Sequence, residues 1–252
     1  MVHGKRELIQ KGAAKGLRMR EKINFNLSWQ FSKDCQEWES VTLPHTWNAA
    51  DGQDGGNDYY RGRCWYRKSF QKPALGRTEQ LWLEIPAAGM TADVYLNDHR
   101  LVHHEGGYSI FRAELTPWLQ KENELVIAVD NSENDRVYPQ KADFTFYGGL
   151  YRGAVLIQVP ENHFVLDYYG APGIRVTPRL FDDNRKAEVS VEVWVSGKAD
   201  SVELTVDGMT AHVPVENGYA CALFTIENVH LWDGVNDPYQ YTASARLADG
   251  DE

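Results

Sequence analysis

The chain has few of the residues and patterns that mark membrane proteins, disulfide-rich proteins or enzymes with a local nucleophile motif. Only three of its 252 residues are cysteines, Cys35, Cys64 and Cys221, and neither a CxxC motif nor a Cys/His spacing accompanies them. That odd, scattered set supports neither a disulfide framework nor a zinc site, and we expect reduced, mostly buried thiols. This cysteine usage favours a cytoplasmic location, and export is left open because the N-terminus could be altered.

Long apolar runs and an excess of basic charge are also missing. No run approaches the roughly 18 residues that would span a bilayer, so we expect no membrane partner. The net charge is −10, although residues 1–22 carry a net +5, which leaves −15 for the rest of the chain. A folded body of that charge would repel phosphates, so we expect no nucleic-acid partner. An uncharged binding partner fits this charge distribution better than a nucleic acid does.

The basic stretch 1–22 has no apolar core that would make it a signal peptide. We expect a disordered arm because little in it could be buried, with a weak amphipathic helix or an engineered extension as the alternatives.

Motifs for nucleophilic, metallopeptidase or nucleotide chemistry are absent: the chain has no GxSxG, HExxH, P-loop or strand-linked GxGxxG. Isolated acids such as Glu84, Glu105 and Glu114 are expected to be solvated residues of strand faces or turns. Carboxylates distant in sequence can still meet in space.

What is present predicts an all-β protein. Val189, Val191, Val193 and Val195 alternate with polar residues and tryptophan, which is typical of a strand with one apolar face. Asn97-Asp98 and Asp207-Gly208 are hairpin-turn signals. The expected strands are 64–70, 80–85, 92–96, 100–103, 124–129, 154–159, 164–169, 174–180, 187–195, 202–206, 219–226 and 239–247.

A boundary is expected near Pro160-Glu161, where a β-branched run ends in proline. Residues 23–160 have the size of a jelly-roll sandwich, and residues 161–252 that of an immunoglobulin-like sandwich. Because the turn signal Asp249-Gly250 ordinarily leads into another strand, we expect the second sandwich to be truncated, without its last strand.

Two stretches could carry binding chemistry. The acidic, glycine-rich loop 51–58 (DGQDGGND) could hold calcium or another cation at Asp51, Asp54 and Asp58, but its spacing is not that of an EF-hand, and a mobile surface loop is the preferred interpretation. Residues 143–152 (DFTFYGGLYR) combine a carboxylate, aromatic rings, a Gly-Gly bend and an arginine. An acid beside aromatic faces can grip a sugar, although each component also has a structural use.

The adjacent pair His103-His104 invites a ligand interpretation. Neighbouring strand residues point to opposite faces, however, so we expect a pair that flanks a turn. The expected first sandwich, residues 23–160, is also rich in tryptophan, and most of these side chains are expected in its core.

Several segments together resemble the N-terminal sugar-binding portion of glycoside hydrolase family 2, which includes β-galactosidases, β-glucuronidases and β-mannosidases. These segments are VTLPHTWNA (41–49), YYRGRCWYRKSF (59–70), LWLEIPAAGMTADVYLNDHRLVHHEGGYSIFRAELTPWL (81–119), NELVIAVDNS (123–132), DFTFYGGLYRGAVLIQVP (143–160) and VHLWDGVNDPYQYTASARL (229–247). The resemblance covers about residues 23–252.

The resemblance implies a galactose-binding-like jelly roll, then an immunoglobulin-like sandwich, then a TIM barrel with both catalytic glutamates of a retaining β-glycosidase. The barrel lies outside this chain, so no catalytic residue is expected in the chain itself. The β-linked sugar would bind through the missing barrel. By position, Asp143 matches the family's sugar-contacting acid. Trp47, Asn57 and Asp58 are further candidates near the substrate, and Arg152 is expected to be structural.

The resemblance favours a β-galactosidase as the parent protein. Two other classes stay open at this point: a free-standing carbohydrate-binding module, and a β-sandwich module for interaction or homo-oligomerisation. We expect no cofactor.

Overall fold

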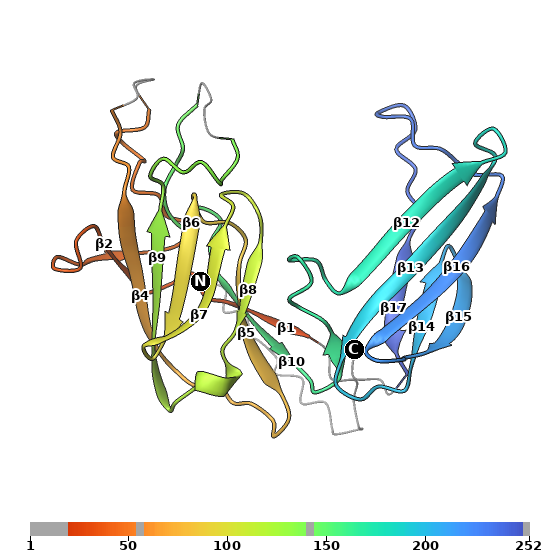
Figure 1. Cartoon of the computed structure of the whole chain (residues 1–252), viewed down its shortest axis with the longest axis horizontal. Helices are drawn as coiled ribbons and strands as arrows, with labels where there is room; N and C mark the ends of the chain where they lie inside the picture. Colours follow the sequence, from red (N-terminus) through yellow and green to blue (C-terminus); the bar gives the residue numbers. More distant parts are fainter. Residues whose placement is uncertain (1–19, 54–57, 140–143, 249–252) are drawn as a thin grey trace, which may run out of the picture.

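The computed structural model describes residues 20–53, 58–139 and 144–248, and it is all-β (Figure 1). Two β-sandwiches lie side by side, as the fold class predicted. In these ranges the only helical element is the short 3-10 turn η1, Thr116–Trp118. None of the described residues form a helix that is long and apolar enough to cross a bilayer.

The first sandwich packs a four-stranded sheet against a six-stranded sheet, and all the strand pairs are antiparallel. The four-stranded sheet has the order β1 (Glu21–Asn24), β10 (Val155–Val159), β5 (Gln80–Ile85) and β8 (Phe111–Glu114). The six-stranded sheet has the order β3 (Glu39–Val41), β2 (Trp29–Ser32), β4 (Arg63–Gln71), β9 (Glu122–Asp130), β6 (Thr91–Leu96) and β7 (His99–Glu105).

The second sandwich has a small sheet on each side of a valine-rich core. In one sheet β13 (Lys186–Ser196) pairs with β11 (His163–Phe164), β12 (Ile174–Phe181) and β16 (Tyr219–Glu227). The other has the order β15 (Met209–Pro214), β14 (Ser201–Val206) and β17 (Ala243–Leu247).

Each sandwich has its own core, built by strand alternation. Along β13 every second residue is buried, because successive side chains point to opposite faces. In the first sandwich the core holds large side chains such as Trp29, Tyr66 and Ile127, all without solvent exposure. The core of the second is made mostly of valine and alanine.

Most of the expected strands are confirmed, and β5 has the predicted bounds. The two turn signals are also confirmed, since Asn97, Asp98, Asp207 and Gly208 all have positive φ. One expected strand, 164–169, is mostly wrong: β11 ends at Phe164, and Tyr169 has a left-handed φ of 46° that no strand residue adopts. At the other end, β1 begins at Glu21, inside the stretch assigned to the basic tail.

Two expectations about polar and sulfur side chains are corrected. Cys64 is buried, but Cys35 and Cys221 are exposed, so the thiols are not mostly buried. Glu84 is not a solvated acid: it is almost fully buried and accepts hydrogen bonds from Arg112 (2.7 Å) and Lys22 (3.0 Å). Burial opposes ionisation of Glu84, but these two cations outweigh it and lower its pKa.

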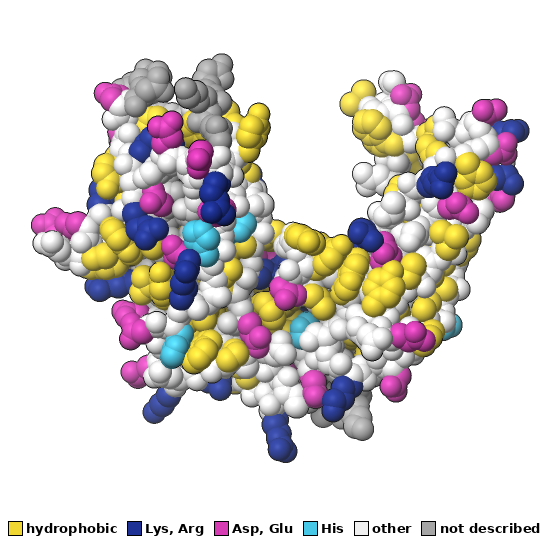
Figure 2. All heavy atoms as spheres, viewed as in Figure 1, with side chains coloured by type: hydrophobic (Ala, Val, Ile, Leu, Met, Phe, Trp, Pro, Cys, Tyr) yellow, Lys and Arg dark blue, Asp and Glu magenta, His cyan; other side chains and the backbone are white. Residues whose placement is uncertain are grey.

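A short joint connects the sandwiches. Arg112 Nη1 donates to the carbonyls of Leu166 (2.8 Å) and Ala171 (2.9 Å), which follow β11, and Leu166 packs with Ile157 and Val159 of β10. Because the same guanidinium pairs with Glu84 in the first sandwich, it fastens the connection to that sheet. Figure 2 shows a broad hollow between the two sandwiches, with hydrophobic side chains along its floor.

Candidate functional site

The candidate site lies at one end of the first sandwich, where the segments 44–53, 58–62, 86–90, 106–109, 131–139 and 144–151 converge (top left in Figure 1). There a cavity of about 290 Å³ is enclosed mainly by aromatic and backbone atoms. Its walls are formed by Thr46, Gly89, Met90, Gly107, Tyr108, Phe144, Thr145, Phe146, Tyr147 and Tyr151. The stretch 143–152, singled out in the sequence, thus supplies half of this wall through residues 144–147 and Tyr151.

Two asparagine side chains with no solvent exposure, Asn48 and Asn131, join the loops from inside. Asn48 Oδ1 accepts hydrogen bonds from the backbone N–H of Gly148 (2.9 Å) and from Asn131 Nδ2 (3.2 Å). Asn131 Nδ2 also donates to the carbonyl of Phe146 (2.9 Å), and its Oδ1 accepts from the N–H of Gly62 (2.9 Å). Because buried amides must satisfy their hydrogen bonds, this pair fixes the segments around Gly62 and around residues 146–148 relative to both asparagines.

Gly148 and Gly149 let the chain bend close to its neighbours. A Cβ on Gly148 would lie 2.0 Å from Trp47 Cζ2, so the indole occupies the space that a side chain would need. Gly149 has a φ of 120°, and a Cβ there would lie 2.5 Å from the carbonyl oxygen of His45. Only glycine fits at either position, and the bend holds the residues before it at the mouth of the cavity.

The rings of the cavity wall are partly open to solvent. Tyr108, Phe144 and Tyr147 are exposed, while Phe146 is buried beneath the Arg61 guanidinium, 5.2 Å from the ring centroid. Phe146 also donates its N–H to the hydroxyl of Tyr59 (3.1 Å), and Tyr151 donates its hydroxyl to the Gly107 carbonyl. Burial raises the pKa of Tyr151, so its hydroxyl stays protonated near neutral pH.

The predicted site residues are not all described. Asp143 and Asn57 lie outside the described residues, as does Asp54. Trp47 is 9% exposed and lies beneath Gly148, where it packs 5.8 Å from the ring of Phe31 and donates Nε1 to the Tyr60 carbonyl (3.3 Å). Asp58 is exposed. The roles of Asp143, Trp47, Asn57 and Asp58 in sugar contact stay predictions.

Asp51 and Gly52, the first residues of the acidic, glycine-rich stretch, are tied to the same centre. Asp51 Oδ1 accepts from Asn48 Nδ2 (3.1 Å) and Asp51 Oδ2 from the N–H of Tyr60 (2.9 Å). The Tyr60 hydrogen bond, ahead of that from Asn48, lowers the pKa of Asp51. Thr145 Oγ1 donates to the Gly52 carbonyl (2.8 Å), which joins this loop to the cavity wall. Among the described residues no three His, Cys, Asp or Glu side chains converge as a metal site would require.

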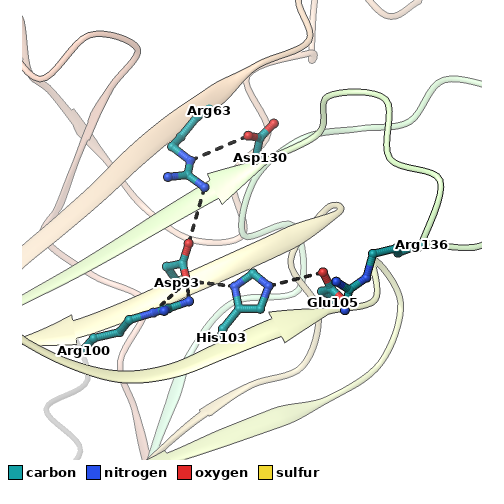
Figure 3. A network of polar contacts seen from close by, with 7 residues as sticks. All are labelled: Arg63, Asp93, Arg100, His103, Glu105, Asp130 and Arg136. Atoms are coloured by element: carbon teal, nitrogen blue, oxygen red, sulfur yellow. Dashed lines mark hydrogen bonds and ion pairs between the residues drawn. The ribbon is translucent and has the colours of Figure 1, made fainter.

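A charged network supports the same end of the sandwich from the outer face of the six-stranded sheet (Figure 3). It consists of Arg63, Asp93, Arg100, His103, Glu105, Asp130 and Arg136. Its centre is Asp93, whose Oδ1 lies 2.8 Å from His103 Nδ1 and 2.5 Å from Arg100 Nη2. Burial opposes ionisation of Asp93, but the hydrogen bonds from His103 and Arg100 lower its pKa overall.

The ends of this network hold the loop that leads to the cavity. Arg63 Nε lies 3.6 Å from Asp130 Oδ2, where β9 ends, and Arg136 Nη2 lies 2.6 Å from Glu105 Oε2 at the end of β7. The residues from 130 to 136 are therefore anchored outside by ion pairs and inside by Asn131.

The two adjacent histidines point to opposite faces, as predicted. His103 joins the charged network, while the ring of His104 stacks on Phe111 with centroids 4.3 Å apart. The guanidinium of Arg152 lies 5.5 Å from the Tyr151 ring centroid, which is the stacking on Tyr151 that a structural role would involve.

Sequence reasoning missed Asn48 and Asn131, the residues that organise the loops. The signal available was weak: Asn131 directly follows β9, but Asn48 lies in an irregular segment between β3 and β4. An asparagine after a strand is common in turns, so nothing local distinguishes a buried one.

The arrangement is suited to binding. Aromatic rings offer faces for the C–H groups of a sugar or another ring, and hydroxyl and backbone groups lie beside them. The described cavity wall contains no carboxylate, histidine or cysteine.

The family model described as "Glycosyl hydrolase 2 galactose-binding domain-like" matches residues 56–154. A β-glucuronidase from Bacteroides fragilis is 29% identical over 242 residues, which cover 89% of this chain and 35% of that protein. A β-galactosidase from Thermoanaerobacter pseudethanolicus is 25% identical, with 90% of this chain and 33% of that protein covered. The chain thus spans about a third of the length of these relatives.

Solved structures agree. The crystal structure of an FMN-binding β-glucuronidase from Facaelibacterium prausnitzii L2-6 superimposes with a TM-score of 0.80 at 40% identity, covering 91% of this chain and 37% of that one. A putative β-galactosidase from Bacteroides fragilis gives a TM-score of 0.80 at 30% identity, covering 92% and 39%. In sequence and in fold, the chain belongs to the N-terminal β-sandwich portion of glycoside hydrolase family 2.

Proposed function

We propose that this chain is the non-catalytic N-terminal part of a retaining β-glycosidase, and that the loop end of its first sandwich forms part of the rim of the sugar site. The observation that carries the proposal is the aromatic cavity whose loops are locked by Asn48 and Asn131. Loops that are fixed before a ligand arrives cost little ordering entropy on binding. That is the role of a rim, which positions substrate for catalytic groups held elsewhere.

Within this rim we propose Asp143 as the acid that binds sugar hydroxyls. It precedes the exposed rings of Phe144 and Tyr147, and the Gly148–Gly149 bend fixes the chain just after them. A carboxylate accepts charge-assisted hydrogen bonds from hydroxyl groups, which are stronger than neutral ones.

For the sugar itself we propose a β-glucuronide, because the β-glucuronidase structure is 40% identical over nearly the whole chain. A β-galactoside, which the sequence favoured, is the second candidate and is supported by the β-galactosidases among the relatives. In both cases hydrolysis would require the two glutamates of the barrel, about 5 Å apart in a retaining enzyme.

The first test is the coding sequence downstream of Glu252. We expect a barrel domain with two glutamates at the carboxyl ends of its strands. A natural stop codon directly after Glu252 would refute the proposal, and the chain would then be a free-standing module.

The second test uses that longer enzyme with 4-nitrophenyl β-glucuronide and β-galactoside. Asp143→Ala is expected to lower kcat/KM by more than about tenfold, because one charge-assisted hydrogen bond is lost. The exposed residue Asp200 in the second sandwich provides the matched control, Asp200→Ala, which is expected to leave the kinetics unchanged. Equal kinetics for both variants would show that Asp143 only caps the turn.

A further inference from the structure

Most of the hydroxyl groups in the cavity wall already donate hydrogen bonds inside the protein. Thr145 and Tyr147 both donate to the carbonyl of Gly52, over 2.8 and 3.3 Å. Tyr151 donates to the carbonyl of Gly107. Each hydroxyl carries a single proton, so these groups have no donor left for a ligand.

The backbone of the wall is used in the same way. The N–H of Gly89 donates to the Gly149 carbonyl (3.1 Å), and the N–H of Met90 donates to the Asp130 carbonyl (2.7 Å). Both backbone groups of Phe146 are paired as well. A sugar ring inside this cavity would give up hydrogen bonds to water and find few replacements, which is unfavourable for buried hydroxyl groups.

An apolar ring would meet no such loss. The rings of Phe144 and Phe146 have centroids 5.2 Å apart and are inclined by 47°, and the Met90 side chain, which is 4% exposed, belongs to the same wall. Aromatic faces and a thioether pack favourably against a further ring. The volume of about 290 Å³ also exceeds the roughly 150 Å³ of an apolar cavity that holds benzene.

Gly107 keeps this space free although the fold does not require a glycine there. Its φ lies outside the left-handed region, and a Cβ would lie 3.4 Å from Met90 Sδ, which is an ordinary contact. Gly89 differs, because a Cβ there would lie 2.3 Å from the carbonyl oxygen of Tyr147. The missing side chain at position 107 therefore leaves room in the cavity that the backbone geometry does not explain.

We propose that this cavity binds an apolar, ring-containing aglycone, so that the substrate is a β-glycoside of such a group and not of a second sugar. Assigning the ring to an aglycone rests on the proposed function, which places the sugar beside the same loops. The binding of an apolar ring depends only on the described wall, because its ring faces are free while most of its polar groups are already paired.

The test uses the 252-residue chain labelled with ¹³C on its methionine methyl groups. Of the four methionines, Met90 lies in the cavity wall, whereas Met209 lies in the second sandwich and serves as the internal control. We expect 2-naphthol to shift the Met90 methyl signal saturably, with a Kd on the order of 1 mM or below, and to leave Met209 unchanged. Glucose and glucuronic acid at the same concentrations should shift neither signal.

Point variants connect the shift to the cavity. Gly107→Val fills part of the space and is expected to weaken 2-naphthol binding at least about tenfold. Phe144→Ala removes one ring face and should weaken it about fivefold, and because Phe144 is 51% exposed, this variant should fold. Tyr169→Ala is the matched control: it removes a ring that is 92% exposed and does not line the cavity, so the affinity should stay unchanged.

Kinetics of the longer enzyme separate this inference from the proposed function. Gly107→Val is expected to lower kcat/KM for a 2-naphthyl β-glycoside, relative to that for the methyl β-glycoside, by at least about tenfold, since only the first substrate has a ring in its aglycone. Asp143→Ala should lower both values together. Loss of the naphthyl preference in Gly107→Val, without any effect of Asp143→Ala, would support the aglycone cavity and refute the proposed sugar contact.

Two results would overturn the inference. One is a Met90 methyl signal that 2-naphthol does not shift, or that glucose shifts as strongly. The other is 2-naphthol binding of unchanged affinity in both Gly107→Val and Phe144→Ala, because the ring would then bind outside the cavity.

Discussion

The two sandwiches differ in how their interiors are closed. The first has loops tied together by Asn48 and Asn131, a core of large rings and branched side chains, and ion pairs across its outer face. The second has a smaller core of valine and alanine, and its edge strand β12 is nearly all exposed. The loop end of the first sandwich is thus fixed from inside and outside, while the second has an open side along β12, where Val176 and Leu180 are exposed.

Glycine substitutions should give the largest difference in stability loss between the two sandwiches. Gly149→Ala is expected to destabilise the first sandwich by roughly 3 kcal/mol or more, since the new Cβ would meet backbone at 2.5 Å and φ is 120°. Gly208→Ala, at a turn in the second sandwich with nothing within 4 Å, should cost only about 1 kcal/mol through its positive φ. Denaturant unfolding followed by segment-resolved hydrogen exchange measures both. Equal costs would mean that the bend at Gly149 can relax.

Removing one member of the buried Asn48–Asn131 pair is expected to give the next largest loss of stability. Asn131→Ala should destabilise the first sandwich by about 3 kcal/mol, because it leaves the Gly62 N–H and the Phe146 carbonyl without this partner. Exchange should increase in residues 144–149. The exposed residue Asn236 in the second sandwich is the control: Asn236→Ala is expected to change stability by less than about 0.5 kcal/mol. Comparable values would contradict a central role for Asn131.

Acid should weaken the first sandwich before the second. Asp93 and Glu84 have pKa values lowered in the folded state, so their contribution is fully present above about pH 4 to 5 and is lost as pH falls through the folded pKa values. In the second sandwich the Arg175–Glu192 pair is more exposed and contributes less. Hydrogen exchange measured between pH 3 and pH 6 tests the order. In Asp93→Asn the acid sensitivity should decrease, and an unchanged profile would assign it to other groups.

The smallest effect is expected at the open side itself. Leu180→Ala should cost about 0.5 kcal/mol, whereas Leu83→Ala, in the closed core of the first sandwich, should cost about 3 kcal/mol. Thermal unfolding compares the two. A large cost for Leu180→Ala would show that its side chain is already covered in solution.

Local signals in the sequence were enough to predict most of the strands and turns. The alternation in β13 and the Asn97-Asp98 turn depend on neighbouring residues only, and both are confirmed. The expected strand at 164–169 failed because the chain there is held by Arg112, more than 50 residues away, and tertiary contacts override strand propensity.

The site was less accessible to sequence reasoning. The aromatic stretch 144–151 does line the cavity, but its partners Gly89, Met90 and Tyr108 come from other loops. Glu84 was expected in solvent because its partners Lys22 and Arg112 lie 62 and 28 residues away. Likewise, the hydrogen bonds of Asn48 extend 83 and 100 residues along the chain. No local sequence pattern predicts contacts between residues so far apart along the chain.

The guanidinium of Arg112 has a mechanical consequence. Its bonds to Leu166 and Ala171 on one side and to Glu84 on the other hold the connection between the sandwiches against the first one. Any polypeptide joined to the second sandwich would be positioned relative to the cavity of the first through this contact. We therefore expect a change at position 112 to loosen the second sandwich relative to the first without touching the cavity wall, to which Arg112 does not contribute.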